Sequence, residues 1–475
     1  MENSKKVLIV TYYWPPAGGP GVQRWLKFAK YLPEFGWEPV IYTPENPSYP
    51  LVDETLTKEV PQDLKIVKTN IWEPYQIAEK FSKSNKKFKG GQFDVGKNQS
   101  FVSKLSIFIR GNFFIPDARK FWVKPSIKFL KDYLKENHID TIVTTGPPHS
   151  LHLIGLGLKK ELPDLKWIAD FRDPWTEISY YKHLKLTSGS ERKHRYLEKS
   201  VFENADLTLA TSYTDAENFR KYGANAFCIT NGFDKLEDSK VGELESQSVG
   251  VLESQSVGVL ESLSVGASES SLHESIGTLK PSNSKTLKPK FTLSYVGVLE
   301  QLRNPENLWK ALITLCEKHQ EFAEDLELKF VGRVDDKILN EIENSVLKNN
   351  ILNLGYLAHD DSVQEMENSN LLLITNFPNE SSKGIIPGKL FEYLATGKKI
   401  ISFGPKDADV ETILDKTKAG KHFDYLESLE IEMFIFSLYE DWKSGKSITN
   451  SANINEFSRR ELTKQLVAKL ESLWV

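Results

Sequence analysis

The hydrophobic residues in the first 234 positions follow two alternating patterns. Short runs that are apolar at almost every position, such as 5–13, are typical of parallel strands buried on both faces. The stretch after this run has apolar residues at helical spacing, and another apolar run begins at 38. A strand, a glycine-containing loop, a helix and a strand in this order predict a parallel crossover. Further strands, each with its loop or turn, are predicted within 139–150, 166–175, 205–212 and 225–234.

This alternation stops after Asp234. An octapeptide close to "GELESQSV" occurs three times in 242–265, and 235–290 is rich in Ser, Glu and Gly without any Phe, Tyr or Trp. Such a composition buries too little apolar area to offset the entropy lost on ordering. We therefore expect a disordered insertion. The alternative, a short β-solenoid or a repeat that docks a partner, is disfavoured because three octapeptides are too few to stack a core.

The alternation of strands and helices resumes at Phe291. Apolar runs predict strands within 291–299, 326–334, 350–357, 370–375 and 398–404, and a final amphipathic helix has Phe457, Leu462, Leu466 and Leu470 on one stripe. We predict an α/β protein with two Rossmann-like doubly wound domains. The predicted segments are 1–234 for the first domain, 235–290 for the insertion, 291–455 for the second domain and 456–475 for the final helix.

The amino-acid composition disfavours several classes of protein. A net charge of -4 with 27% charged residues describes an ordinary surface, so a nucleic acid partner is not expected. The two cysteines, Cys228 and Cys316, lack metal-ligand spacing, which favours a reducing compartment and argues against structural zinc. The first apolar run is too short for a signal peptide, and no stretch approaches the ~20 apolar residues that span a bilayer. We expect a cytoplasmic protein.

Candidate ligand-binding residues follow the predicted strands, because doubly wound sheets bind ligands beyond their carboxyl ends. Gly18 and Gly19 let the backbone approach phosphate or sugar oxygens, although they could serve only a tight turn. His149 could bind a sugar or exchange a proton, although a loop histidine is often merely solvated. The segment "DFRDPW" offers Asp170, Arg172 and Asp173, with an Asp–Arg pair that braces the loop as the alternative.

In the second predicted domain, cations follow successive strands. Arg303 follows the first strand, Arg333 the second, and Lys389 opens a later helix. Fixed positive charges at neighbouring strand ends would stabilise a diphosphate. The loop "KGIIPG", which includes Ile385 and Ile386, offers backbone amides, and Glu392 one turn into the helix could accept two hydrogen bonds from a ribose.

These residues resemble a known family. "PPAGGPGVQRWLKFAKYLPEFGWEPVIYT", "DFRDPW", "TNGFD" and above all "IIPGKLFEYLATGKKII" are similar to the family 4 glycosyltransferases, which are retaining enzymes of the GT-B fold. The resemblance covers nearly the whole chain except 235–290. It implies two domains that face a cleft and a last helix that crosses back to the first domain.

The resemblance also implies roles for individual residues. Gly18 and Gly19 would face the acceptor and the donor phosphates, and His149 and Asp173 would lie on the sugar side. In the second domain Arg303 and Lys389 would hold the diphosphate, with Arg333 as a helper, and Glu392 would bind the ribose.

Two positions depart from the family pattern. Gly384 stands eight residues before Glu392, where many members have an acidic residue, so the sugar stays open. Val298 follows Gly297 where an arginine is usual, which assigns more of the phosphate role to Arg303.

The implied reaction is metal-independent transfer of a sugar, with retention, from a nucleotide-diphosphate sugar to a glycan or lipid-linked acceptor in bacterial surface polysaccharide synthesis. No cofactor is expected, and "DAD" at 407–409 is interpreted as a turn rather than a metal site. Two alternatives remain: a nucleotide-sugar 2-epimerase of the same fold, and a catalytically silent sensor of nucleotide sugars.

One further stretch, 101–135, interleaves aromatic and aliphatic residues with lysines and arginines. Such stretches lie on anionic membrane faces, and here that would be the inner face of the cytoplasmic membrane. A helix that packs on the sheet of its own domain would have the same pattern, so both interpretations stay open.

Overall fold

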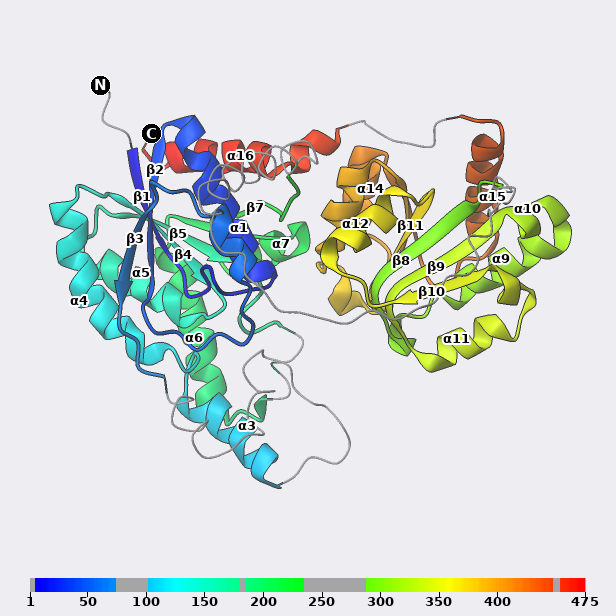
Figure 1. Cartoon of the computed structure of the whole chain (residues 1–475). Coiled ribbons are helices and arrows are strands. Elements are labelled where there is room, and N and C mark those ends of the chain that lie inside the picture. The colour runs from blue at the N-terminus through cyan, green and yellow to red at the C-terminus, as the bar shows by residue number, and fades with distance from the viewer. Residues whose placement is uncertain are drawn as a thin grey trace, which may run out of the picture. The chain divides into compact units, whose positions relative to one another are not determined.

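A computed structural model describes residues 5–73, 101–178, 181, 184–234, 288–446 and 453–474 (Figure 1). The repeats at 242–265 and nearly all of the predicted insertion lie outside the described residues, so the predicted boundaries at 234 and 290 remain predictions. The chain divides into two compact units. One draws on 1–233, 374–426 and 449–475, and the other on 234–373 and 427–448.

The first sheet has seven parallel strands in the order β3-β2-β1-β4-β5-β6-β7. The chain starts in an inner strand, the third in this order, and winds outward in both directions, as the alternating pattern predicts. The strands are β1 (Lys5–Val10), β2 (Trp37–Pro44), β3 (Lys65–Thr69), β4 (Thr141–Gly146), β5 (Lys166–Phe171), β6 (Leu207–Ala210) and β7 (Ala226–Cys228).

Alternate residues of each strand enter two separate hydrophobic cores. Leu8 and Val10 of β1 pack in the core beneath most of the helices, and Val7 and Ile9 in the core beneath α1 and α16. The helices are α1 (Pro20–Tyr31), α3 (Phe101–Phe113), α4 (Lys120–Glu136), α5 (Ser150–Glu161), α6 (Ser188–Asn204), α7 (Tyr213–Lys221) and α16 (Arg459–Ser472), with short 3-10 helices at η1 (Leu32–Phe35) and η2 (Glu54–Glu59).

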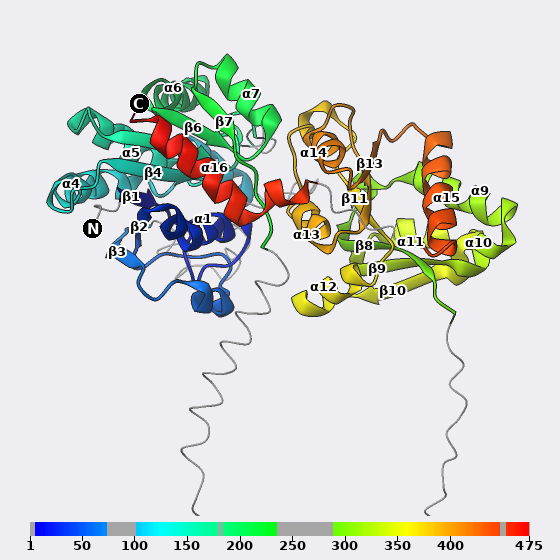
Figure 2. The ribbon, with the colours of Figure 1, turned by 90° about the horizontal axis from the view of Figure 1, so that it is seen from above.

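The C-terminal helix α16 returns to the N-terminal sheet, which confirms the predicted crossing. It lies beside α1 (Figure 2), and Leu462, Leu466 and Leu470 are buried in the same core as β1. Burial of a leucine side chain stabilises a fold by about 1.5–3 kcal/mol, so three such residues hold the helix firmly. An ion pair of 3.1 Å between Lys5 and Glu471 joins the two ends of the chain.

The second sheet has six strands in the order β10-β9-β8-β11-β12-β13. They are β8 (Phe291–Leu299), β9 (Leu326–Val334), β10 (Ile351–Gly355), β11 (Leu371–Thr375), β12 (Lys399–Phe403) and β13 (Gly420–Phe423). The helices between and after them are α9 (Glu306–Lys318), α10 (Gln320–Asp325), α11 (Asp336–Glu343), α12 (His359–Glu367), α13 (Lys389–Thr396), α14 (Asp409–Thr417) and α15 (Leu429–Lys443). The 3-10 helices are η5 (Gln301–Arg303), η6 (Val346–Asn350), η7 (Glu380–Ser382) and η8 (Ile454–Phe457). This is again a doubly wound arrangement, so the predicted fold class is confirmed.

Candidate functional site

The loop after β1 contains the two predicted glycines, and the structure separates their roles. Gly19 has a φ of 96°, which favours glycine, and a Cβ there would meet no atom within 4 Å. Gly18 donates its amide to the carbonyl of Leu51 at 3.0 Å, and a Cβ there would lie 3.0 Å from the Leu51 side chain. Gly18 therefore packs against the segment between β2 and η2, and Gly19 leaves open space at the N-terminus of α1.

His149 directly precedes α5 and is buried. Neither of its ring nitrogens has a hydrogen-bond partner among the described residues, and its ring stacks on Trp175 at 5.1 Å and 6°. Burial lowers the pKa of His149 well below its usual value, and the neighbouring His152 and Arg172 lower it further. The imidazole is therefore neutral at pH 7, with two nitrogens to offer to a ligand.

A second set of side chains holds Trp175 in place. Its indole Nε1 donates to Nδ1 of His194 at 3.0 Å, and its backbone amide donates to Glu198 at 3.2 Å. Glu198 also accepts from the amide and the hydroxyl of Thr176, at 3.1 and 2.5 Å. Sequence reasoning did not find His194 and Glu198, since they lie within the ordinary amphipathic pattern of α6.

The segment "DFRDPW" is braced differently from the Asp–Arg pair considered in the sequence. Asp170 pairs with Arg24 of α1 at 3.0 Å, and it also accepts from Trp25 at 2.7 Å and Thr145 at 2.8 Å. Arg172 instead donates to the carbonyls of Gly146 and Pro147 at the end of β4.

These contacts give the three predicted residues of the segment different roles. Asp170 is fully buried and joins α1 to β5. Asp173 is exposed and lies two residues beyond the end of β5. Gly21 also matters to this arrangement, although the sequence did not indicate it. A Cβ at this position would overlap the guanidinium of Arg172.

Glycines also shape the carboxyl end of the second sheet. Gly297 of β8 and Gly332 of β9 are paired in register and have φ values of 122° and 112°. A Cβ on Gly332 would overlap the carbonyl oxygen of Gly297. The two strand ends therefore lie so close together that a residue with a side chain could not replace Gly332 without a shift of the backbone.

The predicted cations lie at or after the carboxyl ends of neighbouring strands of this sheet. Arg303 follows β8, and Lys389 follows β11, which adjoins β8. Arg333 was predicted to follow the second strand, but it is the penultimate residue of β9, where it pairs in register with Val298. Arg333 is exposed and Lys389 is half-buried at the first position of α13. Arg303 donates to the carbonyl of Val298 at 2.8 Å and lies 3.4 Å from the carboxylate of Glu300.

The loop before α13 is anchored by a buried side chain. Nδ2 of Asn376 donates to the carbonyl of Ile385 at 2.8 Å, and Tyr425 donates to the carbonyl of Asn376 at 2.5 Å. Ile385 is exposed and Ile386 half-buried, so the loop is fixed from within and open outside. Glu392 is exposed one turn into α13. Among the described residues, no cluster of three or more His, Cys, Asp or Glu side chains could hold a metal ion.

Solved structures share this architecture over almost the whole chain. A glycosyltransferase of Rickettsia africae is 15% identical over 99% of both chains, with a TM-score of 0.53. HepE of Anabaena, solved with UDP-glucose, is 14% identical over 98% of this chain and 99% of its own, with a TM-score of 0.51. A UDP-GlcNAc 2-epimerase of Neisseria meningitidis, bound to UDP-GlcNAc, is 12% identical over 98% and 100%, with a TM-score of 0.50. No family model and no curated protein sequence matches the chain.

At these identities the likeness establishes the fold. The two doubly wound sheets and the returning C-terminal helix are those of the GT-B fold, which confirms the fold predicted from the sequence.

Proposed function

We propose that this protein is a retaining glycosyltransferase that moves a sugar from a nucleotide-diphosphate sugar to a glycan or lipid-linked acceptor. The observation that carries the proposal is the placement of Arg303, Arg333 and Lys389 at or after the carboxyl ends of three neighbouring strands of a GT-B sheet. Ligands of doubly wound sheets bind at this edge, and a diphosphate needs several fixed cations there. The process we assign to it is synthesis of bacterial surface polysaccharide in the cytoplasm, which follows the family resemblance.

In the proposed mechanism the protein stabilises the departing diphosphate. Arg303 and Lys389 face the negative charge that grows as the sugar–phosphate bond breaks, and amides of the loop at Ile385 and Ile386 add hydrogen bonds. The donor phosphate would replace Glu300 beside Arg303, since the Glu300 carboxylate is exposed to solvent, which weakens the ion pair. The acceptor hydroxyl attacks from the face that the phosphate leaves and gives its proton to the departing diphosphate, so the configuration of the sugar is retained.

The other candidate residues orient the two substrates. Glu392 would accept hydrogen bonds from the ribose hydroxyls. His149 is neutral, so it would hydrogen-bond a sugar hydroxyl rather than neutralise phosphate charge. Gly19 gives the donor phosphates access to the N-terminus of α1, and Gly18 shapes the same loop for the acceptor. Asp173 would bind the sugar from its exposed position.

The test of the mechanism is the rate of sugar transfer in Arg303→Ala and Lys389→Ala. Loss of one preorganised group opposite developing charge lowers the rate by about 10²–10³-fold. Each variant should lose turnover by that factor with a smaller change in donor KM, and wild-type activity should persist in EDTA. Lys398→Ala, just beyond the other end of α13, is the matched control and should keep full activity. Near-normal turnover in both variants, or loss of wild-type activity in EDTA, would contradict the mechanism.

The ribose assignment is tested separately by titration with nucleoside diphosphates. Glu392→Ala should weaken the affinity, and Glu392→Gln should retain part of it because the amide keeps one acceptor oxygen. Unchanged affinity in Glu392→Ala would remove Glu392 from the site.

A 2-epimerase of nucleotide sugars is the second candidate, because one such enzyme shares the fold. An epimerase changes the donor without any acceptor, whereas a transferase releases the nucleoside diphosphate when an acceptor is present. A silent sensor would bind the nucleotide sugar and do neither.

A further inference from the structure

Most of the large apolar residues of helix α3 lie on its solvent-exposed side, not on the side that packs against the domain. Leu105, Phe108, Ile109 and Phe113 are spaced to share one face, and all are exposed, Leu105 by 46% and Phe113 by 64%. The buried residues Ile107 and Gly111 lie on the other side of the helix. A surface helix normally turns its apolar stripe toward the core of its own domain. An exposed apolar stripe therefore indicates a surface that binds a partner or a membrane.

The exposed apolar area continues beyond α3. Phe121, in the first turn of α4, packs edge-on against Trp72 at 4.6 Å, and Phe114 lies 6.2 Å from Phe121. Trp72 and Phe121 are themselves 51% and 39% exposed. We call this the α3–α4 surface: Trp72, Leu105, Phe108, Ile109, Phe113 and Phe121.

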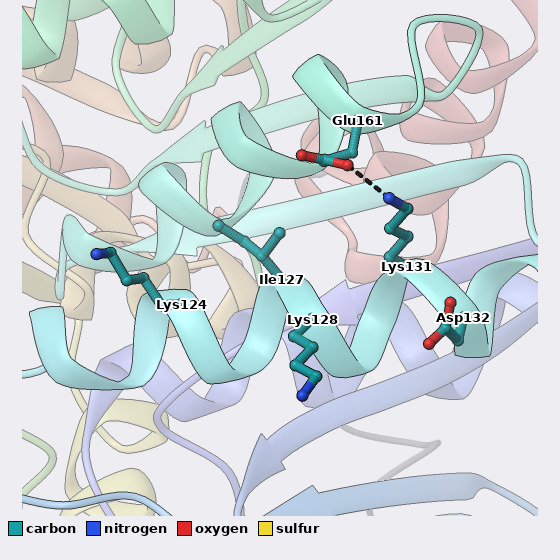
Figure 3. Close-up of a pocket in the computed structure, with 6 residues that line it drawn as sticks. All are labelled: Lys124, Ile127, Lys128, Lys131, Asp132 and Glu161. Carbon is teal, nitrogen blue, oxygen red and sulfur yellow. Dashed lines mark hydrogen bonds and ion pairs between the residues drawn. The ribbon is translucent and has the colours of Figure 1, made fainter.

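Positive charge borders this surface. Lys120 lies 5.4 and 5.2 Å from the ring centres of Phe114 and Phe121. Lys124 and Lys128 follow along α4, both exposed and without an acidic partner among the described residues. They line a groove of about 410 Å³ in which the next lysine, Lys131, pairs with Glu161 at 2.6 Å (Figure 3).

Negative charge is scarce in the same stretch. Between 101 and 135 the sequence has eight basic residues and two acidic residues, Asp117 and Asp132, and Asp132 lines the same groove. The carboxylate of Asp117 accepts hydrogen bonds from the amide and the hydroxyl of Ser150.

The opposite side of α3 is firmly attached to its own domain. The exposure of the apolar stripe therefore does not mean that α3 is detached from the domain. A Cβ on Gly111 would lie 2.8 Å from the carbonyl of Leu184, and His194 approaches the carbonyl of Gly111 at 3.4 Å. Asn112 accepts from the amide of Thr187 at 2.7 Å. These contacts bind α3 to the start of α6 through its small and polar residues. The apolar stripe faces away from them.

We propose that the α3–α4 surface docks on an anionic lipid bilayer. Aromatic and aliphatic side chains enter the boundary between headgroups and acyl chains, and neighbouring lysines attract acidic lipids. The excess of basic residues favours this partner over a second copy of the chain, whose α3–α4 surface would be equally positive. The inference does not rest on the transferase activity, because lipid binding is measured without donor or acceptor.

The test is sedimentation of the full chain with vesicles of phosphatidylcholine, with and without phosphatidylglycerol. The protein should sediment with the acidic vesicles only, and less at high salt. Lys124→Glu with Lys128→Glu should weaken binding at least 30-fold, from about 1 kcal/mol for each lysine lost. Leu105→Ser with Phe113→Ser should weaken it by about tenfold or more. Both side chains of each pair are exposed, so the variants should stay folded, which thermal melting checks.

Matched variants away from this surface complete the test. Leu426→Ser with Leu429→Ser removes two highly exposed leucines, and Lys337→Glu with Lys348→Glu reverses two lysines. Both double variants should bind acidic vesicles as the wild type does. Equal binding to neutral vesicles, or unchanged binding in both α3–α4 variants, would overturn the proposal. A stable dimer that Leu105→Ser with Phe113→Ser dissociates would also overturn it, because the surface would then be a subunit interface.

Discussion

The buried ion pair between Asp170 and Arg24 allows a quantitative prediction. Asp170 is fully buried and Arg24 is 2% exposed in its side chain. Asp170→Ala leaves the buried guanidinium with one hydrogen-bond acceptor among the described residues, the carbonyl of Thr230 at 2.9 Å, and deprives Trp25 and Thr145 of their acceptor. Removal of one partner of a buried pair costs about 3–5 kcal/mol, and the orphaned donors place this case toward the upper end.

The assay is urea unfolding of the wild type, Asp170→Ala, Arg24→Met and the double variant. The double variant should be more stable than Asp170→Ala, because it no longer buries an unpaired charge. Burial alone would raise the pKa of Asp170. The charge of Arg24 and the hydrogen bonds from Arg24, Trp25 and Thr145 together lower it by more, so the pKa lies below the usual value. The stabilisation from this carboxylate should therefore be complete above about pH 4 and be lost as the pH falls through the folded-state pKa. A loss under about 1 kcal/mol in Asp170→Ala would refute the reasoning.

Three further predictions concern substitutions of His152, Gly332 and Trp175. Burial lowers the pKa of His152 to about 3, so between about pH 3 and pH 6.5 the unfolded chain binds a proton that the folded chain does not. This residue should therefore lower the stability by up to about 1.4 kcal/mol for each unit by which the pH falls. Urea unfolding of His152→Gln should show a slope smaller by that amount, while the buried His149 keeps its own contribution. Gly332→Ala should lower the melting temperature and nucleotide affinity because its Cβ overlaps backbone, whereas Gly189→Ala, in the first turn of α6 with open space around it, should lower neither. Trp175→Leu should lower kcat/KM about 10–100-fold through displacement of His149, and equal turnover at an unchanged melting temperature would contradict the positioning role.

The fold was accessible from the sequence because it depends on local periodicity. Apolar runs marked the strands at 5–13 and 291–299, and the leucine stripe of the last helix matches the buried residues Leu462, Leu466 and Leu470. These patterns repeat within a few residues, which is the range over which a strand or a helix chooses its buried face.

The supporting contacts of the site were not accessible in this way. Arg24 and Asp170 are 146 positions apart, and nothing in either local segment names the other as its partner. His194 and Glu198 occupy one helix face among many polar residues, and only the fold brings them under Trp175. Long-range pairing of polar side chains has no period in the sequence, so the residues that hold a site are harder to predict than those that line it.

The central claim is the transfer of a sugar from a nucleotide-diphosphate donor. The most direct measurement follows UDP- and GDP-sugars with and without glycan or lipid-linked acceptors, using nuclear magnetic resonance to identify every product. We predict that one donor releases its nucleoside diphosphate only when an acceptor is present, and that the new glycosidic bond keeps the anomeric configuration of the donor. Conversion of the donor to its 2-epimer without acceptor, or binding of the donor without any product, would contradict the account.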